Sequence, residues 1–216
     1  LFLLRIVACK TTLPKRRRPG RNPESARFVL ALSKAIYRSF SNRRSVYVLA
    51  PEGGSMAISA EHTAHNFNWD LVYQIPHPPP RYVYSTPTYC DYSGIGNDRL
   101  APGAVIVQQL EKARPGDLLL LLAHNPHATS VQNVLRQGKQ QKLEIFLVSG
   151  RAWPKTLGVR GISLGSGRTS TSSDMMQMLG HITARVTRQR FKQRSGKITV
   201  AVLIREDMAQ RRLLRE

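Results

Sequence analysis

The stretch GDLLLLLAHNPHATSVQNVL (residues 116–135) decides the fold class of this chain. Residues 117–123 form an almost wholly apolar run, which is typical of a strand buried on both faces at the centre of a parallel sheet. A helix is expected over residues 129–142, with Thr129 as its N-cap. The short polar loop between them therefore follows the carboxyl end of a central strand, the place where open α/β sheets bind their ligands.

Strands and helices alternate on both sides of this stretch. Hydrophobic periodicity predicts helices over residues 26–40, 56–71, 103–113 and 172–191, with Ser172 or Ser173 capping the last one. Short runs rich in β-branched and apolar residues predict strands over residues 44–50, 82–85, 143–150, 161–165 and 197–207. This alternation indicates a doubly wound α/β sheet with right-handed crossovers. We divide the chain into a basic N-terminal extension (1–25), an α/β domain (26–204) and a basic C-terminal tail (205–216).

The charge balance predicts a polyanionic partner. The chain has 33 Lys and Arg residues against 13 Asp and Glu residues, which gives a formal net charge of +20. Such a charge is normal for a protein that lies against phosphate backbones. We expect RNA contacts without base-specific reading, because the sequence carries no RRM, KH or zinc-finger signature. The residues expected to make them are Lys15, Arg16, Arg17, Arg18, Arg21, Arg185, Arg188, Arg190, Lys192, Arg194, Lys197, Arg211 and Arg212.

The cysteine content and the N-terminal segment give weaker indications of the compartment in which the protein resides. Cys9 and Cys90 are the only cysteines and no CxxC motif is present, which excludes a zinc ribbon or finger and favours a reducing compartment. No apolar run is long enough for a transmembrane helix. The start, LFLLRIVACK, has no acidic residue, so it fits a processed end or the remnant of an organelle-targeting segment, and we expect a mitochondrial matrix location.

Four segments, in order, resemble the sugar isomerase (SIS) domain of the phosphoheptose isomerases and their replication-initiator-associating relatives. They are VYVLAPEGGS (46–55), SAEHTAHNFNWDL (59–71), GIGND (94–98) and VIVQQLEKARPGDLLLLLA (105–123). LEIFLVSG (143–150) and GHITARV (180–186) extend the resemblance to about residues 26–190. It implies a flavodoxin-like three-layer α/β sandwich with a mostly parallel sheet. The family binds phosphosugars and often forms tetramers, to which an N-terminal helix contributes; this chain has its basic arm there instead.

The resemblance also implies a phosphate loop after the central strand. In the family this loop is rich in Ser and Thr, because hydroxyls and backbone amides suit a phosphate. Residues 123–128 of this chain have no hydroxyl, and Pro126 has no backbone N–H. We interpret the loop as a remnant made of His124, Asn125, His127, Thr129 and Ser130. The preceding glycine turn departs as well, since Glu52 would place a negative charge near any bound phosphate, while Gly53 and Gly54 serve the tight turn.

In the phosphoheptose isomerases a glutamate and a histidine move protons during aldose–ketose interconversion, often near a zinc ion. Aligned on histidine, His62 takes the family's metal-ligand position and Asn66 takes the place of the catalytic glutamate. Aligned instead on the glycine turn, Glu61 takes the metal position and His65 that of the glutamate. Neither alignment keeps the glutamate.

The late helix matches the family only in part. His181 matches the family's histidine there, whereas Ser173 replaces a glutamine eight residues earlier. Glu61, His65 and His181 could supply three metal ligands, but we interpret them as ordinary polar residues and expect no metal and no cofactor. The positions His62, His65, Asn66 and His181 are therefore interpreted as a degenerate, non-catalytic site.

These observations favour a pseudoenzyme that serves as a structural, rRNA-contacting subunit of a large ribonucleoprotein, the mitochondrial ribosome, with rRNA and ribosomal proteins as partners. Two alternatives stay open. One is an active phosphosugar isomerase of the phosphoheptose type, and the other is a DNA-replication initiator-associating protein.

Overall fold

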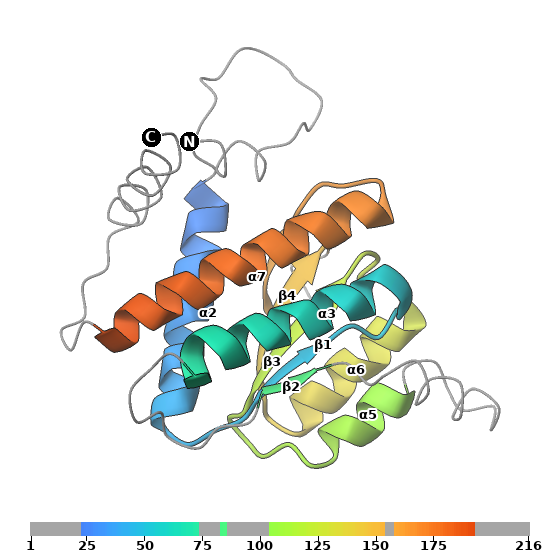
Figure 1. Ribbon diagram of the computed structural model, residues 1–216. Coiled ribbons are helices and arrows are strands. Elements are labelled where there is room, and N and C mark those ends of the chain that lie inside the picture. Colours follow the sequence, from blue (N-terminus) through green and yellow to red (C-terminus); the bar gives the residue numbers. More distant parts are fainter. Residues whose placement is uncertain (1–22, 74–82, 86–103, 154–157, 193–216) are drawn as a thin grey trace, which may run out of the picture.

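A five-stranded, all-parallel sheet forms the centre of the molecule (Figure 1). A computed structural model describes residues 23–73, 83–85, 104–153 and 158–192. The strand order is β2-β1-β3-β4-β5, so the central strand is the leucine run. The strands are β1 (Val46–Leu49), β2 (Val83–Ser85), β3 (Leu118–Ala123), β4 (Glu144–Ser149) and β5 (Arg160–Ser163). The predicted α/β fold with a parallel sheet is confirmed.

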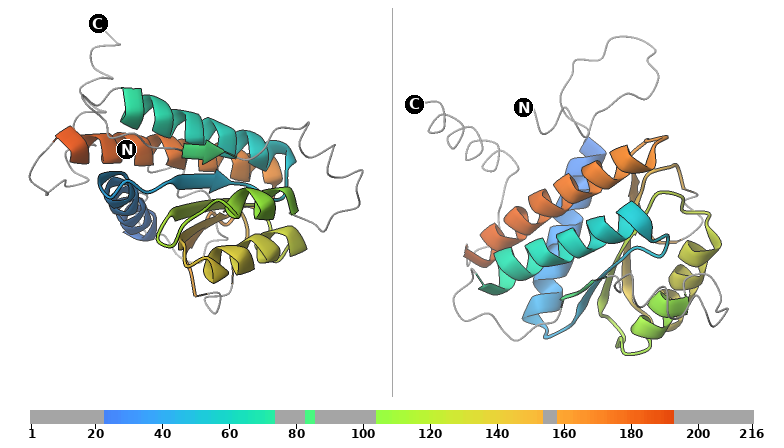
Figure 2. Two further views of the ribbon diagram at one scale, coloured as in Figure 1. Left: turned by 90° about the horizontal axis from the view of Figure 1, so that it is seen from below. Right: turned by 45° about the vertical axis from the view of Figure 1, so that its right-hand side comes forward.

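Helices cover both faces of the sheet and make three layers (Figures 1 and 2). One face carries α2 (Pro23–Ser41), α3 (Gly54–Phe67) and α7 (Thr169–Lys192), and a π-helical turn, η1 (Asn68–Tyr73), continues α3. The other face carries α5 (Ala104–Leu110) and α6 (Thr129–Gln140). None of the helices in the described ranges is both long and apolar enough to span a membrane.

Strand β3 joins the two hydrophobic cores. All six of its residues are buried. Leu118, Leu120 and Leu122 pack into the core under α2, α3 and α7, whereas Leu119 and Leu121 pack into the core under α5 and α6. Successive side chains of a strand point to opposite faces, so an unbroken leucine run can supply both cores at once.

Two predicted helix caps differ from the structure. Thr129 is the first residue of α6, and Ala128 holds the N-cap position without a side-chain hydrogen bond. Helix α7 begins at Thr169, so Ser172 and Ser173 lie inside it and do not cap it. The Ser172 hydroxyl contacts His124 and the Arg168 carbonyl, and the Ser173 hydroxyl contacts Ser59. The predicted strand over residues 197–207, GIGND, residues 1–22 of the N-terminal extension and the C-terminal tail lie outside the described residues, whereas residues 23–25 belong to α2.

The RPGD motif (114–117) has a structural role at the start of β3. The Asp117 carboxylate accepts hydrogen bonds from the backbone N–H groups of Ser45, at 3.0 Å, and Arg114, at 2.8 Å. Gly116 has a φ of +83°, and a Cβ placed there would lie 1.2 Å from Nη1 of Arg44. The motif thus closes a turn and joins the beginnings of β1 and β3, which gives it a structural role in the fold.

Helices α3 and α7 pack closely along a seam of small residues. At Gly180 an added Cβ would lie 2.7 Å from Oγ1 of Thr63. One end of the seam has a hydroxyl pair, in which Ser59 Oγ and Ser173 Oγ are 2.6 Å apart and both residues are buried. Figure 1 shows the two helices side by side on one face of the sheet. The seam fixes which side chains of α3 and α7 can meet.

Gly180→Val is expected to lower the free energy of unfolding by about 1–3 kcal/mol, because the new side chain overpacks the seam against Thr63. Chemical denaturation followed by circular dichroism measures the change. Gly167→Val is the matched control, since no atom lies within 4 Å of a Cβ at Gly167. Equal stability of the two variants would contradict the close approach of the helices.

Candidate functional site

The loops after β1 and β3 meet at the carboxyl edge of the sheet. The Glu52 carboxylate, from the first loop, accepts hydrogen bonds from the backbone N–H groups of His124 and Asn125 in the second. The distance from Asn125 N to Oε1 of Glu52 is 3.0 Å. The two amides that open the predicted phosphate loop are therefore already bound to a negatively charged group.

Several side chains of this loop make hydrogen bonds within the protein. His124 is buried, and its Nδ1 lies 3.0 Å from Oγ of Ser172 at the start of α7. Gly150 makes room for this contact, since a Cβ there would lie 2.6 Å from the same Nδ1. Asn125 Oδ1 accepts a hydrogen bond from the backbone N–H of His127 at 3.2 Å. Of the predicted remnant residues, Ser130 is buried, and His127 and Thr129 are exposed.

A histidine pair lies on the outer side of the α3–α7 seam. Nε2 of His62 and Nε2 of His181 are 3.0 Å apart, and the two rings meet edge to face. The structure thus brings His62 of the histidine alignment together with His181 of the late helix, whereas Glu61 and His65 are exposed on α3. Asn66 lies one turn beyond His62 and is 8% exposed. Helical spacing could indicate that His62 and Asn66 share a face, but not that His181 would reach them.

His181 is held toward its neutral form. The residue is exposed as a whole, but its imidazole is partly covered. This partial burial, then the neighbouring His62 and the Arg185 cation, lower the pKa of His181 below its ordinary value of 6.5. Asp70 acts in the opposite direction and is the smallest of these influences. A neutral imidazole near pH 7 can accept a proton, which is what a general base requires.

The donor atoms do not fit the zinc site that the resemblance implies. The histidine pair supplies two nitrogen ligands. Ser173, which stands where the resemblance implies a glutamine, has a hydroxyl that contacts Ser59 and donates to the backbone carbonyl of Ser55 at 3.1 Å. Within the described residues no group of three or more His, Cys, Asp and Glu side chains could hold a metal ion. Glu61, His65 and His181 do not form such a group, and zinc sites ordinarily use three or four protein ligands.

No protein-family model matches the sequence, and a comparison with curated proteins found no match. Solved structures do match. A phosphoheptose isomerase from Francisella tularensis superposes with a TM-score of 0.64 at 14% identity, over 77% of this chain and 90% of that one. The chain has the fold of the sugar isomerase (SIS) domain.

Two further solved structures also match the chain. A phosphoheptose isomerase from Neisseria gonorrhoeae gives a TM-score of 0.62 at 15% identity, over 77% of this chain and 90% of that one. The NanR protein of Vibrio vulnificus, complexed with ManNAc-6P, gives 0.52 at 7% identity, over 78% of this chain and 62% of that one. Identities this low show the fold, and the predicted flavodoxin-like sandwich is confirmed.

The comparisons contradict the interpretation as an rRNA-contacting subunit of the mitochondrial ribosome. The matched SIS structures include phosphoheptose isomerases, and nothing among them indicates a ribosomal role. They favour the phosphosugar isomerase that we kept as an alternative. The error came from inferring a function from the net charge. Net charge bears on solubility and non-specific association, and it does not identify a functional site. The fold does not support the exclusion of enzymatic activity either.

The basic residues on α7 differ in their surroundings. Arg188 Nη1 lies 3.1 Å from an Asp70 carboxylate oxygen, and Arg190 donates to Ser33 Oγ at 2.9 Å, so both make contacts within the SIS domain. Arg185 and Lys192 are exposed. The prediction that these residues bind RNA is untested, and the remaining basic residues of that prediction lie outside the described part, namely Lys15, Arg16, Arg17, Arg18, Arg21, Arg194, Lys197, Arg211 and Arg212.

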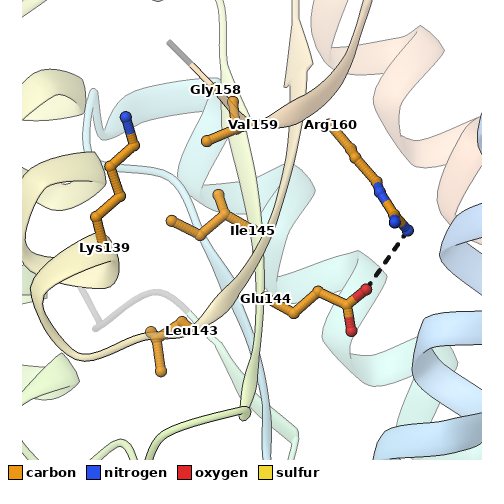
Figure 3. Close-up of a pocket in the computed structure, with 7 residues that line it drawn as sticks. All are labelled: Lys139, Leu143, Glu144, Ile145, Gly158, Val159 and Arg160. Atoms are coloured by element: carbon orange, nitrogen blue, oxygen red, sulfur yellow. Dashed lines mark ion pairs between the residues drawn. The ribbon is translucent and has the colours of Figure 1, made fainter.

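A pocket on the SIS domain lies at the amino ends of β4 and β5, where Glu144 and Arg160 form an ion pair of 3.6 Å (Figure 3). Glu144 also pairs with Arg38 of α2, so the pocket's carboxylate is already neutralised by two cations. This is the opposite edge of the sheet from the Glu52 loop. The pocket is therefore separate from the candidate site; its lining residues are Lys139, Leu143, Glu144, Ile145, Gly158, Val159 and Arg160.

Acidification is expected to destabilise the fold through His181. Its folded-state pKa lies below the ordinary value of 6.5, so the unfolded chain takes up the proton first as the pH falls. Its contribution to stability is complete above the ordinary pKa and is lost as the pH drops through that value toward the folded-state pKa. His181→Ala should therefore show a flatter pH dependence of urea unfolding in this window. Identical slopes for wild type and variant would refute the lowered pKa.

Proposed function

We propose that this chain binds a sugar phosphate at the carboxyl edge of its sheet and interconverts the aldose and ketose forms. The observation that carries the proposal is the contact of 3.0 Å between His62 Nε2 and His181 Nε2. The fold supports the proposal. Helices α3 and α7 belong to the fold that the chain shares with phosphoheptose isomerases, and they bring the two imidazoles together at an exposed surface.

Aldose–ketose interconversion moves a proton between adjacent carbons while the neighbouring oxygen gains and loses a proton. It needs a base near the C–H bond and a donor near the carbonyl oxygen. In the His62–His181 contact one Nε2 donates and the other accepts. A substrate entering between the rings would meet a donor and an acceptor within a few ångström of each other. The lowered pKa of His181 suits it to the role of base.

The distance along α3 suits a ligand with a phosphate at one end. Helix α3 begins at Gly54, directly after the Glu52 loop, and rises by about 12 Å from there to His62. An extended sugar phosphate has a comparable length. Its phosphate would lie toward the loops at the carboxyl edge, and its reacting carbons would lie toward the histidine pair. Each end is held by a different element, so binding and chemistry can be tested separately.

A second candidate is a protein that binds a sugar phosphate without turning it over. Asn66 supports this pseudoenzyme reading, because it stands where the family has its catalytic glutamate and an amide cannot take up a proton. Asn66 Nδ2 is buried and has no hydrogen-bond partner within the described residues. An unpaired buried donor is costly, and a ligand oxygen would satisfy it. The two candidates share the binding step and differ in turnover.

The wild-type chain is expected to interconvert an aldose phosphate and its ketose isomer, and His181→Ala is expected to lower kcat/KM by about 100-fold or more, as for loss of a general base. The assay uses a panel of aldose phosphates that includes a heptose phosphate. NMR follows both product formation and the incorporation of deuterium from D2O. His65→Ala is the matched control, because it removes an exposed imidazole from the same helix.

The outcomes separate the two candidates. Binding without turnover or deuterium exchange selects the non-catalytic protein. Turnover that survives His181→Ala contradicts the assigned role of the histidine pair. Absence of both binding and turnover across the panel refutes both candidates.

A further inference from the structure

We infer that Glu52 determines ligand affinity at this site by acting as an internal anion, which an incoming phosphate must displace from the loop after β3. The inference rests on the sugar-phosphate binding proposed above. It concerns how the phosphate group of the ligand gains access to the backbone amides of the loop.

The Glu52 carboxylate uses the donors that a phosphate would need. It accepts hydrogen bonds from two successive backbone N–H groups, those of His124 and Asn125. Both carboxylate oxygens reach Asn125 N, at 3.0 and 3.2 Å. Successive amides that converge on one negatively charged group form an anion-binding concavity. A second anion cannot use the same two N–H groups while Glu52 holds them.

Residues 124–127 offer few replacement donors to compensate. Pro126 has no N–H, and the N–H of His127 donates to Asn125 Oδ1. The His124 ring is turned inward to Ser172. A ligand phosphate that bound beside Glu52 would therefore meet a carboxylate of like charge without the amides that offset it. Charge-assisted hydrogen bonds of this kind are about twice as strong as neutral ones, so the competition is substantial.

The backbone after Glu52 holds the carboxylate in this place. Gly53 and Gly54 have φ angles of +70° and +53°, in the left-handed region that favours glycine. They turn the chain directly from β1 into α3, which leaves Glu52 at the tip of a short, defined turn. β1 and β3 are neighbouring strands, so the tip lies next to His124. The contact is thus built by the sheet register and does not depend on a long flexible loop.

The test compares phosphate binding by the full chain and by Glu52→Gln, which keeps the size of the side chain and removes its charge. Inorganic phosphate is titrated, and the backbone amide signals of His124 and Asn125 are followed by NMR. The affinity for phosphate is expected to rise about tenfold or more in Glu52→Gln, as expected when a charged competitor for these hydrogen bonds is neutralised. Asp174→Asn is the control, because it removes the same charge from an exposed position near the start of α7.

A second measurement uses the wild-type chain alone, so the inference remains falsifiable if Glu52→Gln fails to fold. Saturating phosphate should shift the side-chain carboxyl signal of Glu52 together with the two amide signals. An unchanged affinity in Glu52→Gln, or an equal gain in Asp174→Asn, overturns the inference even where wild type isomerises sugar phosphates. Tighter phosphate binding by Glu52→Gln with no isomerisation by wild type supports the inference and removes the catalytic half of the proposed function.

Discussion

The close approach of α3 and α7 is the constraint on which the candidate site depends. Gly180 lets α7 come within contact of Thr63, and the hydroxyl pair Ser59–Ser173 satisfies polar groups that burial would otherwise penalise. Helices that pack through small residues hold their outward neighbours at a short, fixed separation. His62 and His181 meet for this reason, since they lie one position to either side of the Thr63–Gly180 contact.

The sheet was predictable because its signals are local. An apolar run such as residues 117–123 has few structural uses, and its alternation with amphipathic segments limits the possible topologies. The start of α7 was not predictable in this way. Serine favours helix caps when its hydroxyl has no other partner, and Ser172 and Ser173 were assigned as caps on that ground. In the structure the Ser172 hydroxyl contacts His124 and the nearby Arg168 carbonyl, and the Ser173 hydroxyl contacts Ser59, so neither serves as the cap.

The site was predictable in its residue types and less so in its geometry. The sequence allows two alignments with the family's metal-ligand and glutamate positions, one on Glu61 and His65 and the other on His62 and Asn66. Only the approach of α7, which brings His181 to His62, favours the second. The charge of Glu52 could be placed near the phosphate loop from its position after β1, but its bonds to two loop amides required the register of β1 and β3. The net charge of +20 misled because it is spread over the chain, whereas a site is defined by a few side chains.

The two ends of the candidate site differ in different ways from the pattern that the resemblance implies. At the helix pair one alignment places Asn66 where the resemblance implies a glutamate, while two imidazoles that can donate and accept protons are in contact. At the loop the hydroxyls are missing, yet the backbone amides still converge on an anion, which is now the protein's own carboxylate. An amide pair that had lost all anion-binding geometry would not hold Glu52 in this manner. The loop therefore keeps the arrangement of an anion site, and its affinity for an external phosphate depends on how readily Glu52 leaves.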